Sequence, residues 1–174
     1  MSRGHSTPLH SPRFAAGFSG IELLVCLALL AGLTTMAMPV WTHWRERHHA
    51  EAARDLLLMD LQLARQQAMA LGQALQLQSL AGCAWRSPQA NDWSCGWQLI
   101  QPSDGTVWHQ TAMTQPLNIR FTKNTALEIS ARGDLGQVGD RWTIQSTLPQ
   151  VVVPQSVCLS NGGRLRWVAQ ASCG

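Results

Sequence analysis

The sequence predicts an α+β fold in which a long N-terminal helix packs against an antiparallel, sandwich-like β domain. Three observations support this prediction. Residues 18–41 are almost continuously apolar, residues 42–72 repeat apolar side chains at helical spacing, and residues 73–174 change to short β-rich runs between turn signals. We therefore divide the chain into a polar leader at residues 1–17, an apolar half-helix, an amphipathic half-helix and a β-rich globular domain.

The composition is that of a chain with one folded domain. Of its 174 residues, 45% are hydrophobic, so the chain can bury a sizeable core even after the apolar segment is set aside. Charged residues make up 13% of the chain and the net charge is only +3, which argues against disorder and against a strongly basic nucleic-acid binder. Any nucleic-acid contact must therefore be local.

The first 41 residues read as a leader followed by a membrane-spanning half-helix. Residues 1–17 contain Arg3 and Arg13 but no acidic residue, which is typical of a weakly basic leader that is removed. At about 1.5 Å per helical residue, the apolar run is long enough for a bilayer core of about 30 Å. Glu22 interrupts this run, and a carboxylate in hydrocarbon costs about 2.5–3.5 kcal/mol, so we expect Glu22 to have a specific partner.

Two other readings of this segment stay open. One is a secretory signal peptide cut after Ala37, because Thr35 and Ala37 approximate a small-x-small cleavage site. Against it, Glu22 would lie inside a region that should be uncharged, and the apolar run exceeds the usual length of about 7–15 residues. The other is a plain membrane anchor that keeps its leader.

The second half of the helix is predicted to be amphipathic. Its apolar positions recur at spacings of three and four residues: Ala50, Ala53, Leu57, Leu61, Ala64, Ala68 and Leu71. This pattern indicates one face that covers a sheet. Trp41 and Trp44 precede it and suit a membrane interface, and Gly72 is a plausible end signal.

The rest of the chain contains the alternating or β-rich runs that predict antiparallel strands. They are Leu75–Leu80, Gly96–Gln101, Thr106–Gln110, Leu117–Phe121, Leu127–Ser130, Trp142–Thr147, Ser156–Ser160 and Leu165–Ala169. Turn signals separate them at residues 102–105, 132–134, 138–140 and 161–163.

The five cysteines fall into two groups. Cys26 lies in the apolar run, where we interpret it as a small packing residue, and Cys83, Cys95, Cys158 and Cys173 lie in the predicted β domain. Outside the cytoplasm such thiols oxidise to disulfides, and the absence of a CxxC pair argues against zinc. Four cysteines allow three connectivities; short loops favour Cys83–Cys95 and Cys158–Cys173 without excluding the others.

No motif predicts catalysis, a cofactor or a metal site. The sequence has no GxSxG, Walker, HExxH or paired-carboxylate pattern, and the glycines of residues 133–140 have the wrong spacing for a dinucleotide fingerprint. His43, His48 and His49 lie next to arginines without a convincingly placed carboxylate, so we interpret them as solvated interface residues. We expect a non-enzymatic protein.

The N-terminal residues resemble the type IV prepilin signature. Gly17, Phe18 and Glu22 match it, and Pro39 falls where many pilins have a helix-kinking proline, whereas Ser19 and Gly20 replace the usual Thr-Leu. The resemblance implies that a prepilin peptidase cuts after Gly17 and methylates the new amino terminus of Phe18. It further implies that Glu22 meets the amine of a neighbouring subunit, and that the protein sits in the bacterial inner membrane with a periplasmic domain. Such a protein is assembled with other subunits into a pilus or pseudopilus.

Within the pilin-like class, the chain resembles the FimT/GspH family. The similarity lies in the helical segment LARQQAM, the strand CGWQL and the terminal VCLSNGGRLRW. The family implies either of two functions. FimT-like members are minor pilins of type IV pili, some of which bind DNA for natural transformation, whereas GspH-like members are minor pseudopilins of type II secretion that have no DNA affinity.

The sequence GRLR, which contains Arg164 and Arg166, resembles the GRxR motif associated with DNA binding in FimT-like pilins. The period of two along a strand predicts that Arg164 and Arg166 share one face, while Leu165 and Trp167 point toward the core. Two adjacent guanidinium groups can bind two phosphates of double-stranded DNA. The alternative is that both are ordinary charged residues of an edge strand.

Further basic residues are candidates for the same surface. No acidic residue follows Asp140, so the arginine pair has no local competitor for phosphate. Two contacts give only weak affinity, and we therefore expect help from more basic residues or from several subunits. Lys123 and Arg132 are the candidate extensions, together with Arg120 and Arg141, although the sequence does not say which way they face.

Overall fold

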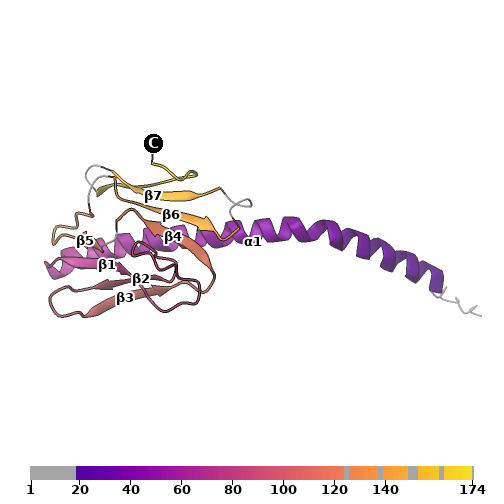
Figure 1. The fold of residues 1–174 in the computed structure, drawn as a ribbon, viewed down its shortest axis with the longest axis horizontal. Coiled ribbons are helices and arrows are strands. Elements are labelled where there is room, and N and C mark those ends of the chain that lie inside the picture. Colours follow the sequence, from indigo (N-terminus) through magenta and orange to yellow (C-terminus); the bar gives the residue numbers. More distant parts are fainter. Residues whose placement is uncertain (1–18, 124–125, 137–138, 149–152, 161–162, 174) are drawn as a thin grey trace, which may run out of the picture. The chain divides into compact units, whose positions relative to one another are not determined.

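The computed structural model describes residues 19–173 except 124–125, 137–138, 149–152 and 161–162, and except the side chains of 35–39. One helix, α1 (Gly20–Leu71), precedes eight strands in the described residues. The strands are β1 (Leu75–Ser79), β2 (Gly96–Ile100), β3 (Val107–Ala112), β4 (Leu117–Phe121), β5 (Leu127–Ile129), β6 (Arg141–Ser146), β7 (Gln155–Leu159) and β8 (Leu165–Val168) (Figure 1). Every strand that the sequence predicts is present, and the α+β fold class is confirmed.

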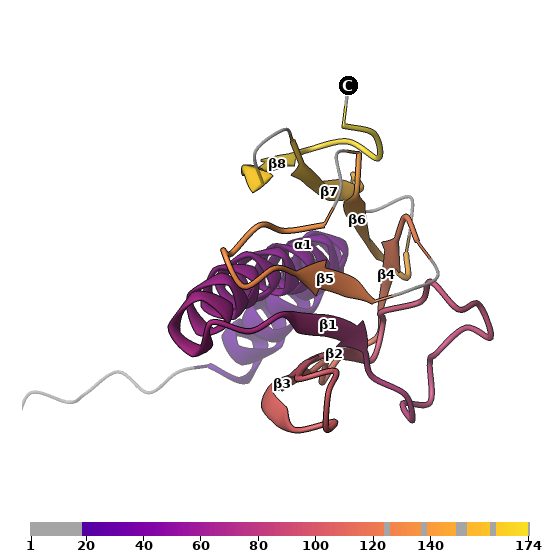
Figure 2. The same cartoon turned by 90° about the vertical axis from the view of Figure 1, so that its left-hand side faces the viewer.

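The strands form two antiparallel sheets. The first has the order β3-β2-β1-β5 and the second the order β4-β6-β7-β8. Both lie against the C-terminal half of α1 (Figure 2). Because β8 stands at the end of this order and, in the described part of the chain, pairs with β7 alone, it is an edge strand of the second sheet.

The described chain divides into two compact units at Pro39. In the first unit α1 begins after Ser19, whose Oγ accepts the N–H of Ile21 at 3.3 Å. Ser19 is therefore an N-cap, and Glu22 in the first turn is exposed near the positive end of the helix dipole. Ser19 and Gly20 stand where the prepilin signature usually has Thr-Leu. The N-cap formed by Ser19 stabilises the start of the helix and partly offsets the low helix propensity of Gly20.

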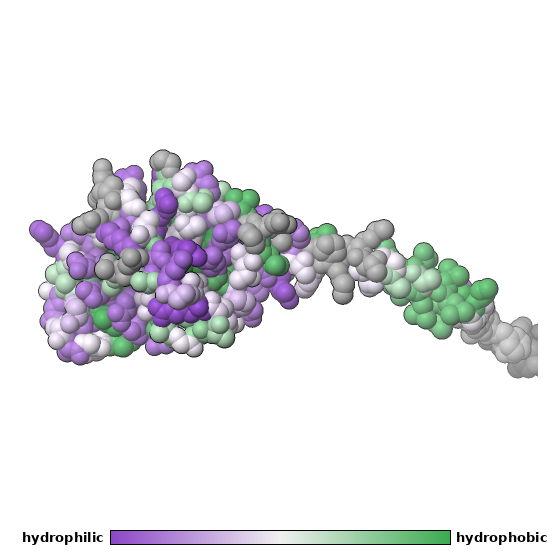
Figure 3. Space-filling view, in the orientation of Figure 1, coloured by the Kyte–Doolittle hydropathy of each residue, from purple (hydrophilic) through white to green (hydrophobic). Residues whose placement is uncertain are grey.

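Most of the exposed side chains described in the first unit are apolar (Figure 3). The exposed ones are Ile21, Leu23, Leu24, Val25, Leu27, Leu29, Leu30 and Leu33, and the free thiol of Cys26 lies among them. Within the described residues, no helix has the length and apolar character needed to cross a membrane. The membrane half-helix at residues 18–41 stays a prediction.

In the second unit the predicted apolar face of α1 is buried. Six of its residues are at most 2% exposed, and they join one core with side chains of both sheets. Trp93, Phe121 and Trp142 form the aromatic centre of this core, where the rings of Phe121 and Trp142 stack at 4.4 Å. Gly72 ends the helix with a φ of 63°, as the sequence predicts.

A buried carboxylate joins α1 to the first sheet. Asp60 is 8% exposed. Its carboxylate accepts hydrogen bonds from Trp97 Nε1 at 2.7 Å and Thr111 Oγ1 at 2.5 Å, and His109 Nε2 lies 3.0 Å away. These partners satisfy a group that is otherwise costly to bury, and they fix β2 and β3 against the helix.

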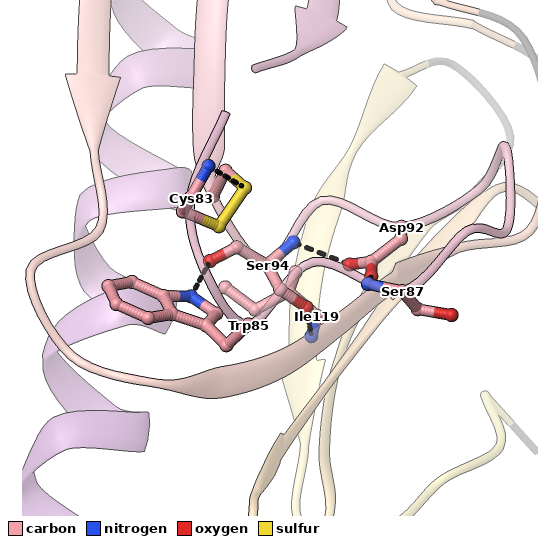
Figure 4. The surroundings of a disulfide bond; sticks show 7 residues. Cys83, Trp85, Ser87, Asp92, Ser94 and Ile119 are labelled. Atoms are coloured by element: carbon pink, nitrogen blue, oxygen red, sulfur yellow. Dashed lines mark hydrogen bonds between the residues drawn. A yellow bond between two sulfur atoms is a disulfide. The ribbon is translucent and has the colours of Figure 1, made fainter. Parts of the chain in front are cut away.

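The disulfides are Cys83–Cys95 and Cys158–Cys173, which is the pairing that the sequence favours. The first ties together the two ends of the loop between β1 and β2 (Figure 4). In that loop Asp92 accepts the backbone N–H groups of Ser87 at 2.5 Å and Ser94 at 2.8 Å. The loop is thus held by both a covalent bond and a carboxylate.

Candidate nucleic-acid interface on the second sheet

The candidate arginines lie on and just before β8, after a hairpin that returns from β7. The register pairs Leu159 with Leu165, Cys158 with Arg166 and Val157 with Trp167. The C-terminal segment then turns back past these strands (Figure 2). The tail is attached to β7 by the Cys158–Cys173 disulfide.

Gly163, which directly precedes Arg164, has a backbone conformation that few other residues adopt. Its φ is 69°, in the left-handed region that favours glycine. Its carbonyl accepts a hydrogen bond from Arg65 Nη2 at 2.5 Å, and a Cβ at this position would lie 3.0 Å from the same nitrogen. Ser160 donates both its backbone N–H and its hydroxyl to the Arg164 carbonyl, each at 3.0 Å. The backbone of the GRLR segment is therefore fixed.

Arg164 and Arg166 are both exposed. Arg166 Nη2 donates a hydrogen bond to the Cys173 carbonyl, which orients its guanidinium group without neutralising it. Among the described residues, neither arginine has a carboxylate partner within salt-bridge distance. Both positive charges are therefore available to an anion.

The expectation that Trp167 points into the core is wrong. Its side chain faces α1 but is 50% exposed, because β8 is an edge strand with no further strand among the described residues to cover it. The guanidinium carbon of Arg54 lies 4.4 Å from the centre of its ring, and Arg54 Nη1 donates to Gln155 Oε1 at 3.1 Å. Trp167 therefore docks β8 on the helix through a cation–π contact.

The two candidate extensions are both placed next to acids. Lys123 Nζ lies 3.0 Å from the buried carboxylate of Asp140, so its ammonium group is already paired with an acid. Arg132 is 92% exposed and its Nε lies 4.0 Å from Asp134. Neither is positioned beside Arg166 by any strand pairing of the described residues. The sequence prediction of Lys123 as a phosphate contact is therefore weakened.

The remaining predicted residues are those of the processing signature and the histidines of α1. Gly17 and Phe18 lie outside the described residues, and Glu22 is the described part of the processing signature. No group of histidines, cysteines and acids in the described chain could hold a metal ion. His48 instead contacts the ring of Trp44 edge-on at 4.1 Å and lies 3.7 Å from Glu51.

Two arginines of α1 that support β8 were not predicted as functional residues. Arg54 holds Trp167, and Arg65 holds the carbonyl of Gly163. They are 11 residues apart, which is close to three helical turns, so both project from the same side of α1. The sequence shows that Arg54 and Arg65 share one side of the helix. It does not show which residues they bind, because their hydrogen-bond partners lie about one hundred residues further along the chain.

Comparisons with known proteins agree with this architecture. The family described as type II transport protein GspH matches residues 52–163, which is more than half of the chain and ends just before the arginine pair. Two crystal structures of the type IV minor pilin FimU of Pseudomonas aeruginosa share the fold. The P21 crystal form is 19% identical with a TM-score of 0.58, and the alignment covers 74% of this chain and 98% of FimU.

The second FimU structure, in space group P65, is also 19% identical, with a TM-score of 0.53 over 71% of this chain and 99% of FimU. No curated protein sequence matches the chain. The long helix, the two antiparallel sheets and the family match lead to one assignment. The chain belongs to the GspH family and is a minor pilin or pseudopilin of the FimT/GspH type, a class of structural proteins that associate with other pilins or pseudopilins.

Proposed function

We propose that this protein is a FimT-like minor pilin that binds DNA for natural transformation through Arg164 and Arg166. The observation that carries the proposal is the exposure of both arginines at an edge strand, where Arg65 and Ser160 hydrogen-bond the backbone carbonyls of Gly163 and Arg164 and no described carboxylate lies within salt-bridge distance of either guanidinium group. A guanidinium group in that setting favours phosphate. The partner is double-stranded DNA, contacted through its backbone.

The expected affinity is weak and independent of base sequence. Two phosphate contacts carry no base readout, and counterion release makes them sensitive to salt. A filament that displays several copies would raise the effective affinity by multivalency. The site therefore suits capture of DNA of any sequence.

The N-terminal unit provides the route into the filament. In our proposal, prepilin peptidase cuts after Gly17 on the cytoplasmic side of the inner membrane and methylates Phe18, and the globular domain stands in the periplasm. The exposed apolar side chains of residues 21–33 are then covered by neighbouring subunits or lipid. Glu22 pairs with the amine of a neighbour, which neutralises two charges in an apolar filament core. Two disulfides suit an oxidising compartment.

A gel-shift experiment tests DNA binding. Full-length protein in detergent should retard a labelled DNA duplex, and the Arg164→Gln/Arg166→Gln variant should retard it much less. Both side chains are exposed, so the variant should fold like the parent. Equal retardation by the two proteins would refute the proposal.

The second candidate is a GspH-like minor pseudopilin of type II secretion, favoured by the description of the matching family. It predicts no retardation of DNA by either protein. It also predicts that genes for secretion components lie near this gene, whereas the first candidate predicts genes for pilus assembly. If mass spectrometry found an uncleaved leader before Phe18, a plain anchored domain would replace both candidates.

A further inference from the structure

Strand register places further arginines on the same face of the second sheet as Arg166. Cys158 on β7 pairs with Arg166 on one side and with Arg141 on the other. Directly paired residues of antiparallel strands project to the same face, so Arg141 and Arg166 lie in one row across three strands. Arg120 on β4 pairs with Thr143, two residues from Arg141, and therefore faces the same way.

This face is the outer face of the second sheet. The neighbouring positions on the same strands, Ile119, Trp142 and Val157, are at most 1% exposed and belong to the core. Arg120 is exposed and Arg141 is half-buried. The three guanidinium groups therefore start from the solvent side of the sheet.

The spacing of the three arginines suits an extended polyanion. With strands about 4.8 Å apart, the Cα atoms of Arg141 and Arg166 are about 10 Å apart. Arg120 and Arg141 are diagonal neighbours, about 7–8 Å apart. The row spans three strand intervals, or about 14 Å, and duplex DNA carries about eight charges over that length.

No carboxylate among the described residues lies within salt-bridge distance of this row, although Asp92, which is buried, forms a β-bridge with Arg120. Arg120 donates to Asn118 Oδ1 at 3.1 Å and to Gln89 Oε1 at 2.5 Å, and both acceptors are neutral. The side chain of Arg141 has no hydrogen-bond or salt-bridge partner among the described residues. Asp140, its neighbour in sequence, is buried and lies against Lys123.

The C-terminal tail crosses this face without adding a charged side chain. Cys173 is bonded to Cys158, between Arg141 and Arg166 in the row. Residues 169–172 are Ala, Gln, Ala and Ser. The described part of the tail therefore brings no charged side chain to the row, and the Cys173 carbonyl orients Arg166 beside it.

We infer that Arg120 and Arg141 continue the phosphate-binding site of Arg164 and Arg166, so that the DNA backbone crosses the strands of the second sheet on its outer face. This inference rests on the proposed function. Arg120 and Arg141 become DNA-contacting residues, and the DNA backbone runs across the strands of the second sheet. In this arrangement Arg120 and Arg141 take the place of Lys123 and Arg132 as extensions of the site.

The test measures binding of full-length protein in detergent to a labelled duplex by fluorescence anisotropy at several salt concentrations. Arg120→Gln/Arg141→Gln should weaken binding about tenfold and reduce the slope of log K against log[salt] by about 1.8, because each phosphate contact contributes about 0.9. The single variant Arg141→Gln breaks no described side-chain hydrogen bond or salt bridge. It should reduce the slope of log K against log[salt] by about 0.9. Arg120→Lys/Arg141→Lys should recover most of the slope.

The matched control is Arg47→Gln/Arg132→Gln, which removes the same charge from two arginines that lie next to acids. It should change the affinity less than about twofold. If Arg120→Gln/Arg141→Gln binds like this control while Arg164→Gln/Arg166→Gln loses affinity, the extended row is refuted and the proposed function stands. If Arg164→Gln/Arg166→Gln binds like the parent, the proposed function is refuted and the row with it.

Discussion

The two disulfides close loops of similar length but hold different parts of the domain, and this difference gives a sharp prediction. Cys158 and Cys173 are separated by 15 residues, and Cys83 and Cys95 by 12. The chain-entropy relation gives about 3.0 kcal/mol for the first loop and about 2.8 kcal/mol for the second. Replacing either pair with alanine should therefore lower the free energy of unfolding by nearly the same amount.

The effects on DNA binding should differ. The Cys158–Cys173 bond holds the carbonyl that accepts the hydrogen bond from Arg166, whereas the Cys83–Cys95 bond closes a loop whose described hydrogen bonds do not reach β8. Without its acceptor, Arg166 must be ordered when DNA binds. Ordering a long side chain costs about 0.5–1.5 kcal/mol, so the affinity should fall about two- to tenfold.

Urea unfolding, followed by tryptophan fluorescence of the full-length protein in detergent, measures the first effect, and anisotropy of a labelled duplex measures the second. Cys158→Ala/Cys173→Ala should lose both stability and affinity. Cys83→Ala/Cys95→Ala should lose stability alone. Equal DNA affinity in the two variants would refute the positioning of Arg166 by the tail.

Three further predictions concern stability. Asp60→Ala should cost about 1–3 kcal/mol, because it leaves the buried Nε1 of Trp97 without an acceptor, and urea unfolding measures this loss. Gly163→Ala should cost about 1–2 kcal/mol from its left-handed φ of 69° and more from the contact with the helix, visible as a lower melting temperature. The backbone N–H of Thr106 holds the pKa of Asp104 below its usual value. Its stabilisation is therefore present above the ordinary pKa and lost as the pH falls through the lowered one, so Asp104→Asn should be less stable than the parent near neutral pH and equal to it in strong acid.

Each stability prediction has a control. Asp55→Ala removes a carboxylate whose side chain is 58% exposed and should cost much less than Asp60→Ala. Gly72→Ala has a similar φ of 63° but no atom within 4 Å of the new Cβ, so it isolates the backbone cost. Equal losses within either comparison would contradict the contacts assigned to Asp60 or Gly163. A constant gap between Asp104→Asn and the parent at all pH values would contradict the lowered pKa.

The features that the sequence predicted correctly are those determined by local pattern. Alternation and turn residues marked the strands, and a three-four spacing marked the helix face that covers both sheets. The disulfide pairing followed from short loops, since closing a short loop loses the least entropy.

The features that it missed depend on contacts between distant segments. The half-exposure of Trp167 follows from its place on an edge strand beside Arg54 of the helix, which no local pattern encodes. Lys123 and Arg141 looked equivalent as basic residues. Strand register places Arg141 in line with Arg166, while a buried acid compensates Lys123.

The most direct test of the central claim is the salt dependence of DNA binding by the full-length protein and its Arg164→Gln/Arg166→Gln variant. Two phosphate contacts predict that the variant's slope of log K against log[salt] is smaller than the parent's by about 1.8, at every duplex sequence tried. Identical slopes for the two proteins, or retention by the variant of the parent's affinity, would contradict the claim that these arginines bind DNA.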